Sequence, residues 1–160
     1  MSEMPKAYDP KAVEAPVFDT WLAGGYFEQK PVPGGERPFT VAIPPPNVTG
    51  SLHMGHALNN TIQDVVVRRA RMTGRPTRWV LGTDHAGIAT QNKVEQMLAK
   101  QGLSRHDVGR EAFVEKCWEW RAEHGSTIIT QLKAMGCSCD YSDEWFTMDP
   151  TYQDAVRTVF

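Results

Sequence analysis

Two histidines lie inside a short run that begins with three prolines, and their spacing suits the binding of a polyphosphate. His53 and His56 are three residues apart, so on a helix they share one face, and Gly55 leaves that face flat. The N–H groups and the positive dipole end of a helix start attract anions. A bare His-x-x-His is more often a cap or a surface pair, but the glycine and the prolines favour a functional site.

The elements around these histidines form a strand-to-helix turn. Residues 39–43 are apolar and β-branched, which predicts a buried strand, and residues 52–72 carry apolar side chains at helical spacing. Prolines fix φ and lack a donor, so the strand cannot continue through them. Thr49 or Ser51 can cap the helix, and Gly50 lets a ligand approach the backbone. Open α/β sheets bind nucleotides at such turns.

A second strand follows the helix and brings an acidic residue to the same place. Residues 77–81 predict a buried strand, and a strand–helix–strand unit has parallel strands. Residues 82–85 (GTDH) should therefore meet the turn at one edge of the sheet. Asp84 can bind a substrate cation there, and it can also cap the next helix, since both roles can hold together. Neither a Gly-x-Gly-x-x-Gly nor a Walker motif occurs, which argues against dinucleotide dehydrogenases and P-loop enzymes.

Before the first strand, the pattern predicts one helix and one loop. Asp9 and Pro10 form a cap followed by proline at the first helical position. Pro16 is expected to kink or restart this helix. Residues 30–38, rich in proline and glycine, are expected to form an exposed loop or hairpin.

After the second strand, mainly helices are expected. Val94, Met97 and Leu98 indicate a short helix closed by Gly102, and a longer helix starts at Asp107 and is interrupted near Gly125. Residues 141–149 form either a loop or an edge strand, and a last helix follows. The long helix should pack in the core through the apolar stripe Phe113, Cys117, Trp120, Ile128, Leu132 and Met135. Arginines at residues 68, 69 and 71 are expected to complement the dipole of the earlier helix.

Composition narrows the class of protein. The 160 residues have a net charge of −2, so no global basic field indicates nucleic-acid binding. Three cysteines, an odd number, fit a reducing cytosol rather than a disulfide framework. Cys137 and Cys139 have one residue between them, which is too close for a zinc knuckle, so no metal site is expected. Neither a signal peptide nor a membrane-spanning run is expected.

Two runs of the chain resemble a known family. The tetrapeptide His53-Met54-Gly55-His56 resembles the His-Ile-Gly-His signature of class I aminoacyl-tRNA synthetases. A closer resemblance, to valyl-tRNA synthetases in particular, lies in the longer runs PPPNVTGSLHMGHA and GTDHAGIATQ. Isoleucyl relatives usually carry glycine where Pro44 stands. The resemblance extends from about residue 8 to the C-terminus.

The resemblance implies a fold and a reaction. The fold is α/β, a Rossmann-like class I nucleotide-binding fold, with an N-terminal helical arm and loop over residues 1–37. Residues 38–160 would form the first half of the catalytic domain. The reaction is ATP-dependent activation of valine to valyl-adenylate, followed by transfer to tRNA(Val). Mg²⁺ would arrive with ATP, and no protein-bound zinc is expected. The implied protein is cytoplasmic, and monomeric at full length.

The resemblance also implies the role of each site residue. The histidines meet the phosphates, Gly55 lies under the adenine, Asp84 receives the ammonium of the amino acid, and the prolines wall its isopropyl group. The expected site comprises the catalytic residues His53 and His56, the ATP-binding residues Asn47, Thr49, His53, Gly55 and His56, and the valine-binding residues Pro44, Pro45, Asn47 and Asp84.

Other parts of the family pattern are missing from these 160 residues. No Lys-Met-Ser-Lys-Ser loop occurs, and there is no room for an editing or anticodon-binding domain, so a fragment is expected. Two alternatives stay open. A small nucleotidyltransferase shares the His-x-Gly-His turn and would be complete near this length, although the proline and GTDHAG runs argue against it. The other is a non-catalytic ATP-binding fragment.

Overall fold

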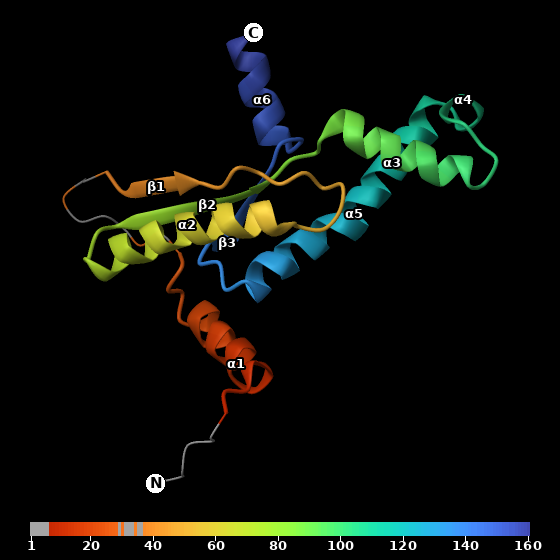
Figure 1. Cartoon of the computed structure of the whole chain (residues 1–160). Coiled ribbons are helices and arrows are strands. Elements are labelled where there is room, and N and C mark those ends of the chain that lie inside the picture. Colours follow the sequence, from red (N-terminus) through yellow and green to blue (C-terminus); the bar gives the residue numbers. More distant parts are fainter. Residues whose placement is uncertain (1–6, 29, 31–33, 35–36) are drawn as a thin grey trace.

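A computed structural model describes residues 7–28, 30, 34 and 37–160. Its centre is a three-stranded parallel sheet in the order β1-β2-β3 (Figure 1). The strands are β1 (Phe39–Ala42), β2 (Thr77–Thr83) and β3 (Asp140–Phe146). Both strand pairs are parallel, so the predicted α/β fold and its strand–helix–strand unit are confirmed. Of the two readings of residues 141–149, the edge strand is the right one.

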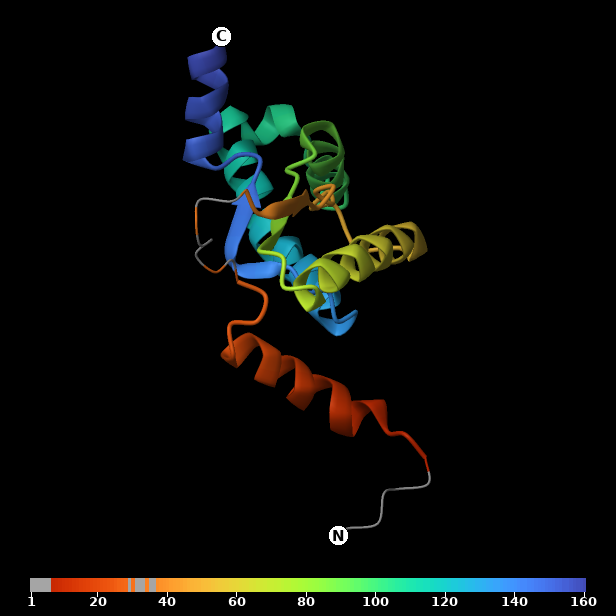
Figure 2. The same cartoon turned by 90° about the vertical axis from the view of Figure 1, so that its left-hand side faces the viewer.

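The helices connect and flank these strands. Figures 1 and 2 show α1 and α6 projecting from opposite sides of the molecule, while α2 lies along the sheet. The bounds are α1 (Pro10–Ala23), α2 (Met54–Met72), α3 (Gly87–Ala99), α4 (Arg105–Val108), α5 (Arg110–Ala134) and α6 (Pro150–Val159). The division into an arm over residues 1–37 and a catalytic part over residues 38–160 stays a prediction.

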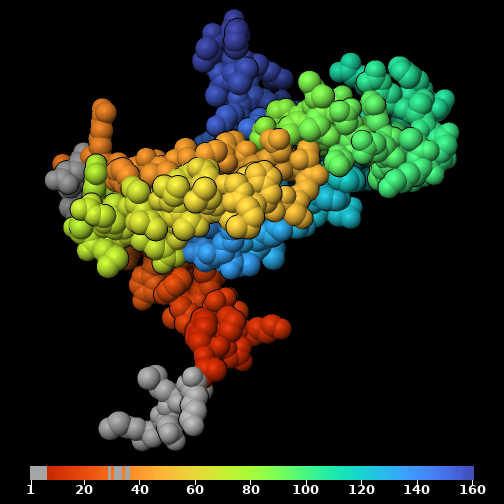
Figure 3. Space-filling model, in the orientation of Figure 1, coloured from red at the N-terminus to blue at the C-terminus, as the bar shows by residue number. Residues whose placement is uncertain are grey.

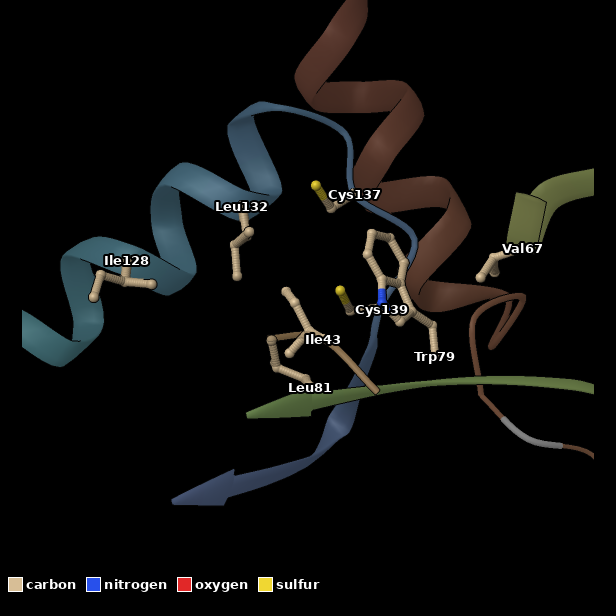
Figure 4. Close-up of a cluster of buried hydrophobic side chains, with 8 residues drawn as sticks. All are labelled: Ile43, Val67, Trp79, Leu81, Ile128, Leu132, Cys137 and Cys139. Atoms are coloured by element: carbon tan, nitrogen blue, oxygen red, sulfur yellow. The ribbon is translucent and has the colours of Figure 1, made fainter. Parts of the chain in front are cut away.

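The main core lies between the sheet and two helices, α2 and α5. Alternate side chains of a strand point to one face, so Trp79 and Leu81 of β2 share this side. Figure 4 shows them meeting Val67 of α2 and Ile128 and Leu132 of α5. All five are buried, and each such side chain contributes about 1.5–3 kcal/mol relative to exposure. This packing fixes the C-terminal turns of both helices relative to the strands.

The apolar stripe that predicts α2 lies on the outer face of the helix. Met54, Leu58 and Val65 are 83%, 65% and 62% exposed, and Figure 3 shows α2 uncovered on this side. The face that packs on the sheet buries Val67 and Ala70 instead. Periodicity therefore predicts the helix correctly, but it does not identify the face that packs.

The long C-terminal helix differs from its prediction in two ways. The helix expected from Asp107 is two helices, because Gly109 adopts a φ of 80° between α4 and α5. Helix α5 then runs unbroken for 25 residues through Gly125, where an interruption was predicted. Phe113, Ile128 and Leu132 of the stripe are buried, whereas Met135 caps the helix and is partly exposed.

The first helix follows its predicted start. Asp9 is the N-cap and accepts a hydrogen bond from the backbone N–H of Lys11 at 3.1 Å. Pro16 lies inside a continuous helix and does not restart it. Phe18 alone is buried, with its ring 6.0 Å from that of Tyr141. The loop predicted over residues 30–38 lies largely outside the described residues.

Two arginines of α2 bind the segment between α5 and β3. The guanidinium of Arg68 donates to the carbonyl of Gly136, and that of Arg71 donates to the hydroxyl of Ser138, both at 2.7 Å. These residues therefore join two elements, beyond the dipole role predicted for them. Beside them Cys137 is buried, and burial raises the pKa of its thiol to about 11.

Core packing predicts that the same change, leucine to alanine, has different effects on stability at two positions. Leu132→Ala removes a fully buried side chain, so we expect it to lower the free energy of unfolding by about 2–5 kcal/mol. Leu58→Ala makes the same change on the exposed face of α2 and should alter the free energy of unfolding by less than about 0.5 kcal/mol. Urea denaturation of both variants gives the comparison, and equal losses would contradict this assignment of faces.

Candidate functional site

The loops that follow β1 and β2 are joined by backbone hydrogen bonds beyond the ends of the strands. The N–H of Asp84 donates to the carbonyl of Pro46, and the N–H of Val48 donates to the carbonyl of Asp84, both at 2.9 Å. This parallel bridge pairs Asn47 with Asp84. The proline run and the GTDH run therefore meet at one edge of the sheet, as predicted from the parallel strands.

The carboxylate of Asp84 is held on one side and open on the other. The hydroxyl of Thr147 donates to Oδ1 at 2.9 Å, and Nδ1 of His85 lies 3.4 Å from the same oxygen. Within the described part of the chain, no hydrogen bond reaches Oδ2. Because the side chain is 33% exposed, this oxygen can accept hydrogen bonds from a cationic ligand.

Asp84 does not cap the next helix, so that prediction was wrong. The N-cap of α3 is Ala86, which has a left-handed φ of 46° and no side-chain hydrogen bond to the helix. Such a conformation costs about 1–3 kcal/mol in a residue other than glycine. The hydroxyl of Thr90 donates to the carbonyl of His85 at 2.7 Å and holds this strained turn in place. The carboxylate is thereby left for a ligand.

The two histidines of the turn cap α2 reciprocally. His53, and not Thr49 or Ser51, is the N-cap residue, and α2 begins at Met54. Its Nδ1 accepts from the N–H of Gly55 at 3.0 Å, while Nδ1 of His56 accepts from the N–H of His53 at 3.2 Å. Imidazole nitrogens thus occupy positions that serine and glutamate oxygens usually fill at a helix start.

These hydrogen bonds define the protonation of both rings. A backbone N–H can only donate, so each Nδ1 must be unprotonated, and the proton of the neutral imidazole must lie on Nε2. Each Nε2–H is then free to donate to an anion at the positive end of α2. The ring centroids are 3.9 Å apart. Burial, and secondarily the neighbouring His53, hold the pKa of His56 below its ordinary value.

Gly55 is required by the position of the His53 ring. A Cβ at residue 55 would lie 2.9 Å from Cε1 and 3.0 Å from Nδ1 of His53, which is closer than real contacts allow. Any larger residue would therefore displace the capping imidazole. The flat surface predicted beneath a nucleotide base stays a prediction, but the glycine has a structural reason of its own.

Two residues that the sequence did not single out hold the site together. Gln131 of α5 accepts a hydrogen bond from the N–H of Leu52 at 2.8 Å and so fixes the turn just before the histidines. Thr147 binds both Asp84 and the backbone N–H of His85. Thr147 directly follows β3, so three parallel strand ends at one edge were the signal that could have found it.

The remaining predicted residues lie along the same turn. Asn47 and Pro44 are exposed, and Thr49 is half-buried. Pro45 lines a groove of about 590 Å³ on the face of the sheet away from α2, together with Gly82 and Thr147. Pro44 is not among the residues that line this groove.

Neither a metal cluster nor a membrane-spanning helix is found in the described ranges. Across residues 7–28, 30, 34 and 37–160, no three histidine, cysteine or carboxylate side chains are grouped so as to hold a metal ion. None of the helices in these same ranges is both long and apolar enough to cross a bilayer.

Comparison with known proteins identifies relatives along most of the chain. The family model for class I tRNA synthetases (I, L, M and V) matches residues 16–160. Valine–tRNA ligases of Geobacter sulfurreducens and Thermus thermophilus are 56% and 53% identical over 158 residues, which is 99% of this chain. The chain spans 18% of the length of these relatives.

A solved structure supports the fold. The crystal structure of a LeuRS–tRNA–LeuAMS ternary complex from Agrobacterium radiobacter K84 superposes with a TM-score of 0.75. It covers 96% of this chain and 17% of the LeuRS chain, at 21% identity. Together with the parallel sheet, this agrees with the predicted Rossmann-like class I fold.

The reciprocal cap predicts how stability depends on pH. The pKa of His56 is lower in the folded than in the unfolded chain. Neutral His56 therefore makes its full contribution to folding stability above pH 6.5, and this contribution is lost as the pH falls below that value. His56→Asn keeps an acceptor, Oδ1, near the position of Nδ1 but does not titrate. We therefore expect equal unfolding free energies for the variant and the original chain at pH 8. At low pH the original chain should be less stable by about 1 kcal/mol, the usual effect of losing a cap.

Urea denaturation from pH 8 to pH 5 gives this difference directly. Comparing the two proteins at each pH cancels the effect of groups that do not contact His56. A difference that stays constant over this range would exclude His56 as a neutral capping group.

Proposed function

The chain belongs to the class I tRNA synthetase family, and we propose that it is the segment of a valine–tRNA ligase that holds ATP and valine for valyl-adenylate formation. The observations that carry the proposal are the two Nδ1 caps, which leave Nε2–H donors at the start of α2, and the open carboxylate of Asp84 after the neighbouring strand β2. The Nε2–H donors suit a triphosphate, and the carboxylate of Asp84 suits an ammonium group. The named relatives are valine–tRNA ligases, which supports valine as the amino acid.

The proposed chemistry needs no covalent bond to the protein. A carboxylate oxygen of valine attacks the α-phosphorus of ATP, the bond to the bridging oxygen breaks, and pyrophosphate leaves with the electron pair. Catalysis then consists of positioning the reactants and stabilising charge on the phosphates. His53 and His56 would donate from Nε2 to phosphate oxygens. Mg²⁺ would enter bound to ATP, since this metal prefers phosphate oxygens and water.

The amino acid would lie across the joined loops. Its ammonium would be bound by Oδ2 of Asp84, whose other oxygen is already held by Thr147. Thr147 and Pro45 also line the apolar groove of about 590 Å³, so an isopropyl group could lie there while the ammonium meets Asp84. Asn47 and Thr49, on the turn between the prolines and the histidines, would contact the substrate polar groups. The valyl group would then pass to tRNA.

A chimera tests this function in a complete enzyme. The 158 matching residues of the Geobacter sulfurreducens valine–tRNA ligase can be replaced by this chain, with which they are 56% identical. We expect valine-dependent exchange of pyrophosphate into ATP. A folded chimera that binds ATP without exchange would favour the non-catalytic alternative, and exchange driven by leucine but not valine would overturn the assignment of the amino acid.

The role of His56 can be separated from its role as a cap. His56→Asn retains a cap acceptor but lacks the donor at Nε2, so the chimera should stay folded while pyrophosphate exchange falls about 10²–10³-fold. Valine affinity should change little, because the donor faces the phosphates. Exchange at saturating ATP provides the measurement. An unchanged rate would remove His56 from the mechanism.

Asp84 should affect the amino acid more than the nucleotide. In the chimera, Asp84→Asn replaces a charge-assisted contact by a neutral one, and we expect KM for valine to rise about tenfold or more while KM for ATP stays within about twofold. Asp154→Asn removes a carboxylate from the exposed surface of α6 and serves as the control. Equal increases in both KM values would instead indicate that Asp84 only supports the loop.

A further inference from the structure

A second cavity lies next to His85 and shares no lining residue with the groove beside Pro45. Its volume is about 410 Å³, within the range of small-molecule sites. Residues of α3 and α5 line its sides, and Phe146 and Met148 at the end of β3 line its end. His85 belongs to its wall, but the capping histidines do not.

The walls of this cavity are mainly aromatic and aliphatic. Phe146 is buried at its end, with Trp118 edge-on at 6.1 Å between ring centroids and His85 edge-on at 6.4 Å. Phe113 and Cys117 of α5 line the side. Aromatic side chains pack favourably against another ring in edge-to-face or offset arrangements, so an aromatic guest suits such a wall.

Positive charge lines this apolar cavity without a balancing carboxylate. No aspartate or glutamate is among its lining residues, whereas Arg110 and Arg121 both are. In the ranges that the structure describes, neither arginine takes part in an ion pair or a side-chain hydrogen bond. The guanidinium of Arg121 lies over the ring of Phe146, 4.2 Å from its centroid, so its donors are placed at the aromatic wall.

We propose that this cavity binds a small aromatic carboxylate, with its ring against the partly exposed Trp118 and its acid group on Arg121. An arginine fork matches a carboxylate with two hydrogen bonds, and its weakly hydrated plane tolerates an aromatic neighbour. Arg110 lies eleven residues earlier, about 16 Å along α5, so it marks the far end of the cavity and does not share the same carboxylate. The proposal does not depend on the proposed function.

Cys117 provides a reporter inside the cavity. Its thiol is the most accessible of the three, whereas Cys137 and Cys139 are buried in the core. Burial raises the pKa of the Cys117 thiol, so it should react slowly with N-ethylmaleimide. A guest in the cavity should slow this reaction further. Mass spectrometry of the labelled peptide follows Cys117 alone.

The test uses the 160-residue chain with 2-naphthoate and its neutral analogue 2-naphthamide as probes. We expect 2-naphthoate to protect Cys117 at a concentration about tenfold lower than 2-naphthamide, because one charge-assisted contact is lost in the amide. Arg121→Gln should remove this tenfold preference. Arg157→Gln removes one positive charge from an exposed position on α6, so this control variant should keep the preference for the acid.

Four results would overturn the proposal. Three are no protection by 2-naphthoate at millimolar concentration, equal protection by acid and amide, and an unchanged preference in Arg121→Gln. Circular dichroism of each variant shows whether it is folded, and Val114→Trp, which fills the partly exposed mouth of the cavity, should abolish protection without changing Arg121. Protection that survives Val114→Trp would place the probe elsewhere and also refute the site.

Discussion

The site depends on the short parallel bridge between the loops that follow β1 and β2. Three consecutive prolines offer no N–H group, so residues 44–46 can pair with the loop after β2 only through their carbonyls, and N–H donors return only beyond them. Pro46 supplies the carbonyl and Val48 supplies the N–H, both bound to Asp84. This pairing ties the proline turn to the acidic loop. A ligand between them therefore meets groups that are already in place.

Two further sets of hydrogen bonds position the start of α2 relative to these loops. Gln131 fixes the N–H of Leu52, and the histidine pair then satisfies the first donors of the helix. An imidazole used as a cap acceptor differs from a serine or an aspartate, because its second nitrogen remains a donor on the outer side. One residue can thereby stabilise the helix and also present an N–H to an anion. Gly55 makes this possible by leaving room for the His53 ring.

Much of the fold and part of the site could be predicted from the sequence. Strands and helices of the βαβ unit follow from local periodicity, and the meeting of Asp84 with the turn follows from parallel topology. The N-cap could not be predicted, since statistics favour Thr49 or Ser51 and the choice depends on how the His53 ring is oriented. Thr147 and Gln131 reach the site through long-range pairing. No local pattern indicates which face of α2 packs on the sheet.

The central claim is that both histidines cap α2 through Nδ1 and keep the proton on Nε2. Nitrogen NMR of the imidazole rings in the 160-residue chain tests it most directly, because protonated and unprotonated ring nitrogens have distinct chemical shifts. At pH 8, Nδ1 of His53 and of His56 should be unprotonated, with couplings across the hydrogen bonds to the amides of Gly55 and His53. A proton found on Nδ1 of either ring would contradict the account.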